Sequence, residues 1–160
     1  MLVTLQPGTY TVALRGKDDS TGVALIELYD LDAASSKLVN ISTRAFVGTG
    51  SDVMIAGLIV KISNAKVVAR GVGPSLGAFG VQNPLPDPRL DLYNSQGSVI
   101  EANDDWQAPK AAEIWNTALA PRDDSEAAVL TTVGPGNYTA ILSDKNGAAG
   151  VGLVEVYQLE

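Results

Sequence analysis

The residues best suited to binding a metal ion form an acidic run, Asn103, Asp104 and Asp105, and a second acidic pair follows at Asp123 and Asp124. Carboxylate and amide oxygens on loops are the ligands that calcium takes in proteins. Their spacing does not match an EF-hand loop. Two interpretations stay open: a Ca²⁺ site, which is the one cofactor that the sequence suggests, or an acidic turn whose side chains accept hydrogen bonds from backbone N–H groups.

A second candidate is Ser75, in the run Gly73-Pro74-Ser75-Leu76-Gly77. This run fits the G-x-S-x-G pattern of a nucleophile elbow. The chain has no histidine to accept the serine proton, and a lysine base would have to be Lys61 or Lys66. We therefore expect no enzyme activity, and we interpret the run as a Gly/Pro-rich crossover in which Ser75 caps a short helical turn.

Three aromatic residues, Tyr93, Trp106 and Trp115, could stack on a sugar ring if they lie exposed on one surface. Burial would instead make them core residues. Carbohydrate binding is therefore the alternative to a purely structural role. A glycoside hydrolase is a third possibility, and it would need two carboxylates roughly 5–10 Å apart in a cleft.

The composition excludes several classes of function. Because the chain has no cysteine and no histidine, it has no disulfide framework, no thiol nucleophile and no Ser-His-Asp triad. Its net charge of −7 repels phosphate backbones, so we expect no nucleic-acid binding. No apolar run is long enough to span a bilayer, so we expect no membrane insertion.

An internal repeat organises the elements that must position these residues. Residues 2–32 (the leading copy) and 130–160 (the C-terminal copy) align without a gap at an offset of 128 positions, with 14 identities in 31 aligned positions. Each copy reads as a β-hairpin, with strands at 9–15 and 23–31 in the leading copy. We interpret the leading copy as the terminal hairpin of a preceding repeat unit. It could pack on the same core, which its apolar faces favour, or be exchanged with a neighbouring module.

Both copies keep a glutamate, Glu27 and Glu155, in the middle of the second strand, on the face that is identical in the two copies. A buried carboxylate without a partner costs several kcal/mol. The sequence therefore predicts a structural ion pair, with Arg44 or Arg70 as the cation.

The remaining segments alternate short strand patterns with Gly, Pro and Asn turns. One of them, VMIAGLIVKI, is apolar on both alternating faces and therefore predicts a buried strand. Together the segments predict an all-β chain, an antiparallel, jelly-roll-like β-sandwich of about ten to twelve strands with one short helix at 108–118. With 46% hydrophobic residues, the 160 residues can form one domain with a substantial core.

The run LDLYNSQGSVIEANDDW, followed by VGPGNYTAIL, resembles the bacterial pre-peptidase C-terminal domain. Motifs from LVNISTR through VARGVGPSLGAFGV to GVGLVEVY resemble a tandem β-sandwich module of large secreted bacterial proteins. The resemblance implies a non-catalytic module, secreted or on the cell surface, with a structural, adhesive or docking role in a larger protein and a calcium site at the Asp pair. Its partners would be neighbouring repeats, or a surface polysaccharide or protein, and a hairpin-swapped oligomer would be one form of association.

Overall fold

The computed structural model describes residues 1–31 and 38–159. The chain divides into two compact units, Met1–Lys37 and Leu38–Glu160. The eight strands found in the described residues all belong to the second unit. Among these residues no helix has the length and apolar character needed to cross a membrane.

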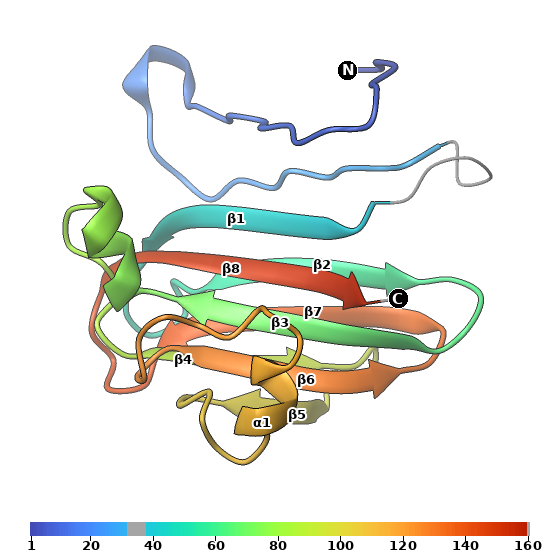
Figure 1. Cartoon of the computed structure of the whole chain (residues 1–160). Helices are drawn as coiled ribbons and strands as arrows, with labels where there is room; N and C mark the ends of the chain where they lie inside the picture. Colours follow the sequence, from blue (N-terminus) through green and yellow to red (C-terminus); the bar gives the residue numbers. More distant parts are fainter. Residues whose placement is uncertain (32–37, 160) are drawn as a thin grey trace. The chain divides into compact units, whose positions relative to one another are not determined.

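The second unit is a sandwich of two four-stranded antiparallel sheets (Figure 1). One sheet has the order β1-β8-β3-β6 and consists of β1 (Asn40–Val47), β8 (Gly150–Leu159), β3 (Ala65–Val72) and β6 (Ala127–Val133). The other has the order β2-β7-β4-β5 and consists of β2 (Met54–Val60), β7 (Gly136–Asp144), β4 (Pro88–Tyr93) and β5 (Val99–Asn103). The all-β sandwich is confirmed, with eight strands in the described residues where ten to twelve were expected.

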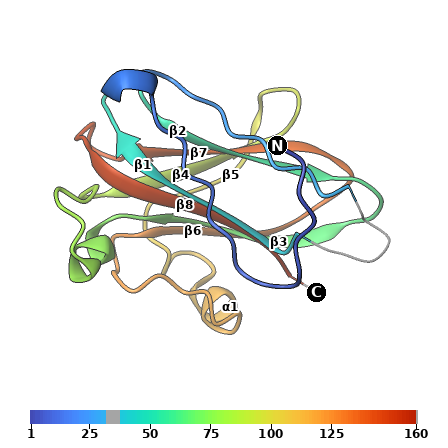
Figure 2. The ribbon, with the colours of Figure 1, turned by 90° about the horizontal axis from the view of Figure 1, so that it is seen from above.

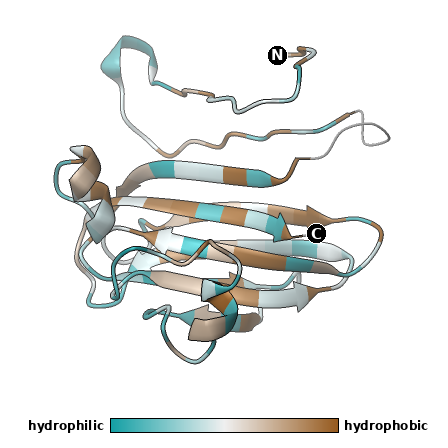
Figure 3. Cartoon of the chain, in the orientation of Figure 1, coloured by the Kyte–Doolittle hydropathy of each residue, from teal (hydrophilic) through white to brown (hydrophobic). Residues whose placement is uncertain are grey.

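Strand alternation builds the core between the two sheets. In β4, for example, Leu90 and Leu92 are buried while Asp91 is only half-buried. Hydrophobic bands alternate with polar bands along the strands (Figure 3). The main core cluster draws on both sheets and includes Val47, Met54, Ala56, Ala69, Leu90, Leu92, Ala140, Leu142, Val154 and Val156.

A second layer covers the outer side of β3 and β6. The short helix α1 (Ala111–Trp115), which lies within the range expected for a helix, sits beside β6 (Figure 2). Its Ile114 packs with Trp106, Val68 and Leu130 in a second core cluster. β3 and β6 are therefore apolar on both faces because both faces are covered. The run VMIAGLIVKI was also expected to be covered on both faces, and that expectation is wrong: β2 is an edge strand, and Ile55 and Ile59 are more than half exposed.

The C-terminal copy supplies one central strand to each sheet. β7 lies between β2 and β4, and β8 lies between β1 and β3. The copy is thus an arch that crosses from one sheet to the other, and the expected β-hairpin is wrong in this respect. Alternation in the sequence identifies strands, but it does not say which strands exchange hydrogen bonds.

The leading copy forms no strand in the described residues, although strands were expected at 9–15 and 23–31. Its one regular element is a 3₁₀ turn, η1 (Lys17–Asp19). Every described side chain of the leading copy is exposed except Asp30, which is half-buried. A β-hairpin without further strands is marginally stable at best, which accounts for the difference.

One local contact is nevertheless the same in both copies. The Tyr10 hydroxyl donates to the Gln6 carbonyl at 2.7 Å, and the Tyr138 hydroxyl donates to the Gly134 carbonyl at 3.0 Å. These are equivalent positions of the repeat.

Candidate functional site

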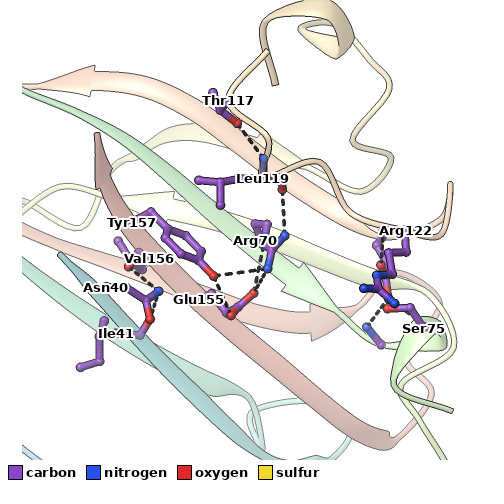
Figure 4. A network of polar contacts seen from close by, with 12 residues as sticks. Asn40, Ile41, Arg70, Ser75, Thr117, Leu119, Arg122, Glu155, Val156 and Tyr157 are labelled. Carbon is purple, nitrogen blue, oxygen red and sulfur yellow. Dashed lines mark hydrogen bonds and ion pairs between the residues drawn. The ribbon is translucent and has the colours of Figure 1, made fainter. Parts of the chain in front are cut away.

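The polar cluster of the C-terminal copy is centred on Glu155 and Arg70, which face each other in the register of β8 and β3. Arg70 donates to the Glu155 carboxylate through Nε at 2.9 Å and through Nη2, and its Nη1 donates to the Leu119 carbonyl at 2.9 Å (Figure 4). The Tyr157 hydroxyl donates to Glu155 Oε1 at 2.9 Å, and the Arg70 guanidinium lies over the Tyr157 ring. Arg44, the other candidate cation, lies on β1 opposite Leu153 and is exposed.

The polar groups of this cluster bind one another. Glu155 is 8% exposed, and both of its carboxylate oxygens accept hydrogen bonds from protein groups. Burial, followed by the negative charge of Glu155, raises the pKa of Tyr157 above its usual value. A carboxylate that is fully engaged by an arginine and a tyrosine serves to join two strands, and it has no free atom for a substrate.

The equivalent site of the leading copy is incomplete. The Tyr29 hydroxyl donates to Glu27 Oε1 at 3.1 Å, as Tyr157 does to Glu155, and this hydrogen bond raises the pKa of Tyr29. Among the described residues of its own unit, 1–31, Glu27 has no hydrogen bond or ion pair with an arginine or lysine. The same two side chains therefore meet in both copies, and in the C-terminal copy Arg70 completes the group.

Glu126 is a buried carboxylate that the sequence analysis did not identify. It is 0% exposed, and its Oε1 accepts hydrogen bonds from the backbone N–H groups of Gly73 and Ser75, each at 3.0 Å, and from the Ser75 hydroxyl at 2.6 Å. Its Oε2 accepts the backbone N–H groups of Arg122 and Asp123. Glu126 thereby joins the crossover at residues 73–75 to the loop before β6. The only signal in the sequence is a glutamate next to an apolar strand, which is not specific.

This arrangement corrects the role expected for Ser75. Ser75 is the second residue of a 3₁₀ helix, η2 (Pro74–Phe79), whose N-cap position is Gly73, and its side chain does not cap the helix. The hydroxyl donates instead to Glu126, which itself accepts the first N–H groups of the turn. The Ser75 hydroxyl is thus directed to a carboxylate that also accepts four backbone hydrogen bonds.

Two carboxylates of the acidic run at residues 103–105 contact a lysine. Lys145 Nζ lies 3.0 Å from Asp104 Oδ2 and 3.6 Å from Asp105 Oδ2, and the hydrogen bond to Asp104 raises the pKa of Lys145. The Asn103 amide points into the turn, where it donates to the carbonyls of Asp105 and Ala108.

The second acidic pair does not join this run. Asp123 accepts hydrogen bonds from the backbone and hydroxyl of Ser125, and Asp124 accepts one from Gln107. Within the described ranges, no three Asp, Glu, His or Cys side chains are grouped closely enough to hold a metal ion. A calcium ion at residues 103–105 stays a prediction, and it would have to displace the Lys145 ammonium group. Thermal melts with calcium and with EDTA check it, because an ion that binds only the folded state raises Tm.

The three aromatic candidates lie in different environments. Trp106 is 6% exposed and donates through Nε1 to the Asp123 carbonyl at 3.2 Å, whereas Trp115 is 69% exposed. Their rings stack, with centroids 6.3 Å apart and planes 18° from parallel. Together they line a hollow of about 860 Å³, and among the described residues that line it Asp124 is the one carboxylate. Tyr93 lies on β4, in the other sheet, and does not line this hollow.

Fold and sites together define a two-sheet antiparallel β-sandwich module whose buried polar groups are used in internal contacts. No protein-family model and no curated protein matches the chain. Among solved structures, the chain is similar to the pre-peptidase C-terminal domain of collagenase from Bacillus anthracis, with 10% identity and a TM-score of 0.47 over 74% of this chain and 89% of that chain. This is the domain family that the run LDLYNSQGSVIEANDDW resembles.

Proposed function

We propose that the chain is a non-catalytic structural module of a larger secreted protein, and that its leading copy docks, as a two-strand arch, into a second sandwich of the same class. The observation that carries this proposal is the repeat itself. The leading copy has the sequence of the two central strands of a sandwich, yet in the described residues it belongs to no sheet.

The exposed side chains of the leading copy support docking. Val23, Leu25, Tyr29 and Leu31 are each at least 66% exposed. Burying them would stabilise an association by roughly 25 cal/mol for each Å² of apolar surface removed from water. Unpaired strand sequence also offers backbone N–H and C=O groups for pairing with another sheet.

Glu27 indicates the chemistry of the acceptor. In the C-terminal copy, the equivalent carboxylate is held by Arg70 from the neighbouring strand β3. The acceptor should therefore carry an arginine at the position equivalent to Arg70. A carboxylate that enters a sandwich without that partner would be buried and unpaired, at a cost of several kcal/mol.

The packing of the C-terminal copy indicates that the acceptor differs in detail from residues 38–129. At Gly152, a Cβ atom would lie 2.9 Å from Leu142 Cδ2 and 3.3 Å from Val47 Cγ2, and the leading copy has Ala24 at this position. At Asp144, the carboxylate accepts the backbone N–H groups of residues 87, 146 and 148, whereas the leading copy has Gly16.

Three more buried positions are larger in the leading copy. Their occupants in the C-terminal copy are each at most 5% exposed. The replacements are Val12 for Ala140, Ile26 for Val154 and Leu28 for Val156. Because inserting methylene groups into a packed core costs about 1–3 kcal/mol, the leading copy fits a sandwich with smaller residues facing these positions.

A five-fold variant tests this proposal. Val12→Ala, Gly16→Asp, Ala24→Gly, Ile26→Val and Leu28→Val together give the leading copy the core residues of the C-terminal copy. We expect the variant to insert its leading copy into the sandwich of residues 38–129. Size-exclusion chromatography with light scattering should then show oligomers that increase with concentration, or hydrogen exchange should show protection gained at residues 8–31 and lost at 136–159.

The control adds Glu27→Lys to the same variant. This change places an ammonium group against Arg70 and should prevent the leading copy from inserting into the sandwich. The variant with five substitutions could instead stay monomeric and show the hydrogen-exchange pattern of the wild type. In that case the leading copy does not insert into a sandwich, and the proposal is wrong.

A further inference from the structure

We propose that the hollow beside Trp115 binds a neutral saccharide. This inference is independent of docking by the leading copy, because all the residues that line the hollow lie between positions 106 and 124. It rests on how one tryptophan is held in place while it stays exposed.

Trp115 is a fixed, exposed aromatic surface. It occupies the last position of α1, and its ring is stacked on Trp106. Trp106 is itself buried and is held through its indole N–H, so the lower ring of the stack is fixed. Trp115 is nevertheless 69% exposed, and its own indole N–H has no hydrogen-bond acceptor among the described residues. A flat aromatic surface with a free donor suits a ligand that offers an apolar face beside polar groups.

The rest of the hollow offers small and polar side chains. Ala112 and Ala120 leave room for a ring to approach the indole. Gln107, Arg122 and Asp124 supply an amide, a guanidinium and a carboxylate, with Gln107 Nε2 donating to Asp124 Oδ1 at 2.6 Å. Sugar hydroxyls both donate and accept hydrogen bonds, so they can use all three groups.

The charges favour a neutral ligand. Arg122 and Asp124 carry opposite charges in the same hollow, and the net charge of the chain is −7, which disfavours polyanions. The Arg122 guanidinium also lies 5.2 Å from the centre of the Phe79 ring, which is 65% exposed and extends the aromatic surface beyond the hollow. With Asp124 as the one carboxylate among the described residues that line it, the hollow lacks the pair of acids used in glycoside hydrolysis, so the interaction is binding without cleavage.

The first measurement is binding of the full chain to an array of neutral plant, fungal and bacterial glycans, followed by affinity electrophoresis through the polysaccharide that gives the strongest signal. We expect Trp115→Ala to weaken binding at least tenfold, because it removes the exposed aromatic surface on which the apolar face of a sugar ring would stack. Asp124→Asn should weaken it less, and Phe46→Ala should not change it. Phe46 is the matched control, since it is an equally exposed aromatic residue on β1.

A thermal melt of each variant checks that it is folded. Because Trp115 is exposed, we expect Trp115→Ala to leave Tm unchanged. Absence of binding to every glycan on the array would overturn the proposal. So would equal binding by the wild type and Trp115→Ala, or equal losses in Trp115→Ala and Phe46→Ala. A negative result for saccharide binding does not affect the experiment on insertion of the leading copy, so each proposal can be rejected without the other.

Discussion

Glu155 and Glu27 occupy the same position of the repeat but lie in two different environments. Glu155 is buried and paired with Arg70, whereas Glu27 is exposed and accepts a hydrogen bond from Tyr29 within its own unit. The chain therefore contains its own matched control for the contribution of the carboxylate to stability.

We expect Glu155→Gln to lower the free energy of unfolding by about 3 kcal/mol, because it leaves a largely buried guanidinium without its counter-ion. The estimate is at the lower end of the range for buried pairs because the Arg70 side chain keeps 19% exposure. Glu27→Gln should change the free energy of unfolding by no more than about 0.5 kcal/mol, as is usual for an exposed residue. Urea unfolding of the two variants measures both values, and similar losses in the two would show that Glu27 also has a buried role.

The two buried carboxylates differ in how well the sequence predicts them. Glu155 stands out because the repeat keeps it in the middle of an otherwise apolar strand, and Arg70 was one of two candidate partners. Glu126 has no such signal, since its partners are mostly backbone N–H groups of a crossover that is distant in the sequence. Backbone donors carry no residue type, so a sequence cannot show which carboxylate will bind them.

At the scale of the element, β8 is held close to the segment that precedes β4. Leu85 N–H donates to the Val151 carbonyl at 2.8 Å, and Val151 N–H donates to the Asn83 carbonyl at 2.8 Å. Gly150 permits this approach, because a Cβ atom there would lie 2.7 Å from the Leu85 backbone. The requirement for glycine is thus steric, and it comes from a segment that strand patterns do not reveal.

Gly150→Ala should accordingly destabilise the sandwich by about 3 kcal/mol, the upper end of the range for overpacking, since backbone cannot move aside as a side chain can. The equivalent change in the leading copy, Gly22→Ala, meets no atom within 4 Å and should cost no more than about 0.5 kcal/mol. Thermal unfolding compares the two. A small effect of Gly150→Ala would mean that the segment around Leu85 shifts readily.

For the whole molecule, the composition and the alternating strands were enough to predict an all-β sandwich. They did not give the strand order, because pairing across a sheet depends on long-range contacts that local patterns do not encode. The run at 54–60 illustrates this: its apolar residues suggested a strand covered on both faces, but β2 lies at a sheet edge with two isoleucines exposed. The repeat was detectable from sequence alone, whereas the division of its two strands between sheets was not.

The division of the chain into two units leads to a prediction about stability. All the buried hydrophobic side chains of the described residues lie between positions 47 and 156, and none belongs to the leading copy. Deletion of residues 1–37 should therefore change the free energy of unfolding by less than about 1 kcal/mol, which corresponds to only a few degrees in Tm for a domain of this size.

The matched control is deletion of residues 130–160, which repeats the same sequence pattern but removes a central strand from each sheet. We expect that shortened chain to lose cooperative unfolding altogether, since neither sheet can close over the core without β7 and β8. Circular dichroism during urea unfolding distinguishes the two deletions. A loss of more than about 2 kcal/mol on removal of residues 1–37 would instead mean that the leading copy packs on the core of its own chain, and the docking proposal would then have to be abandoned in favour of a single domain.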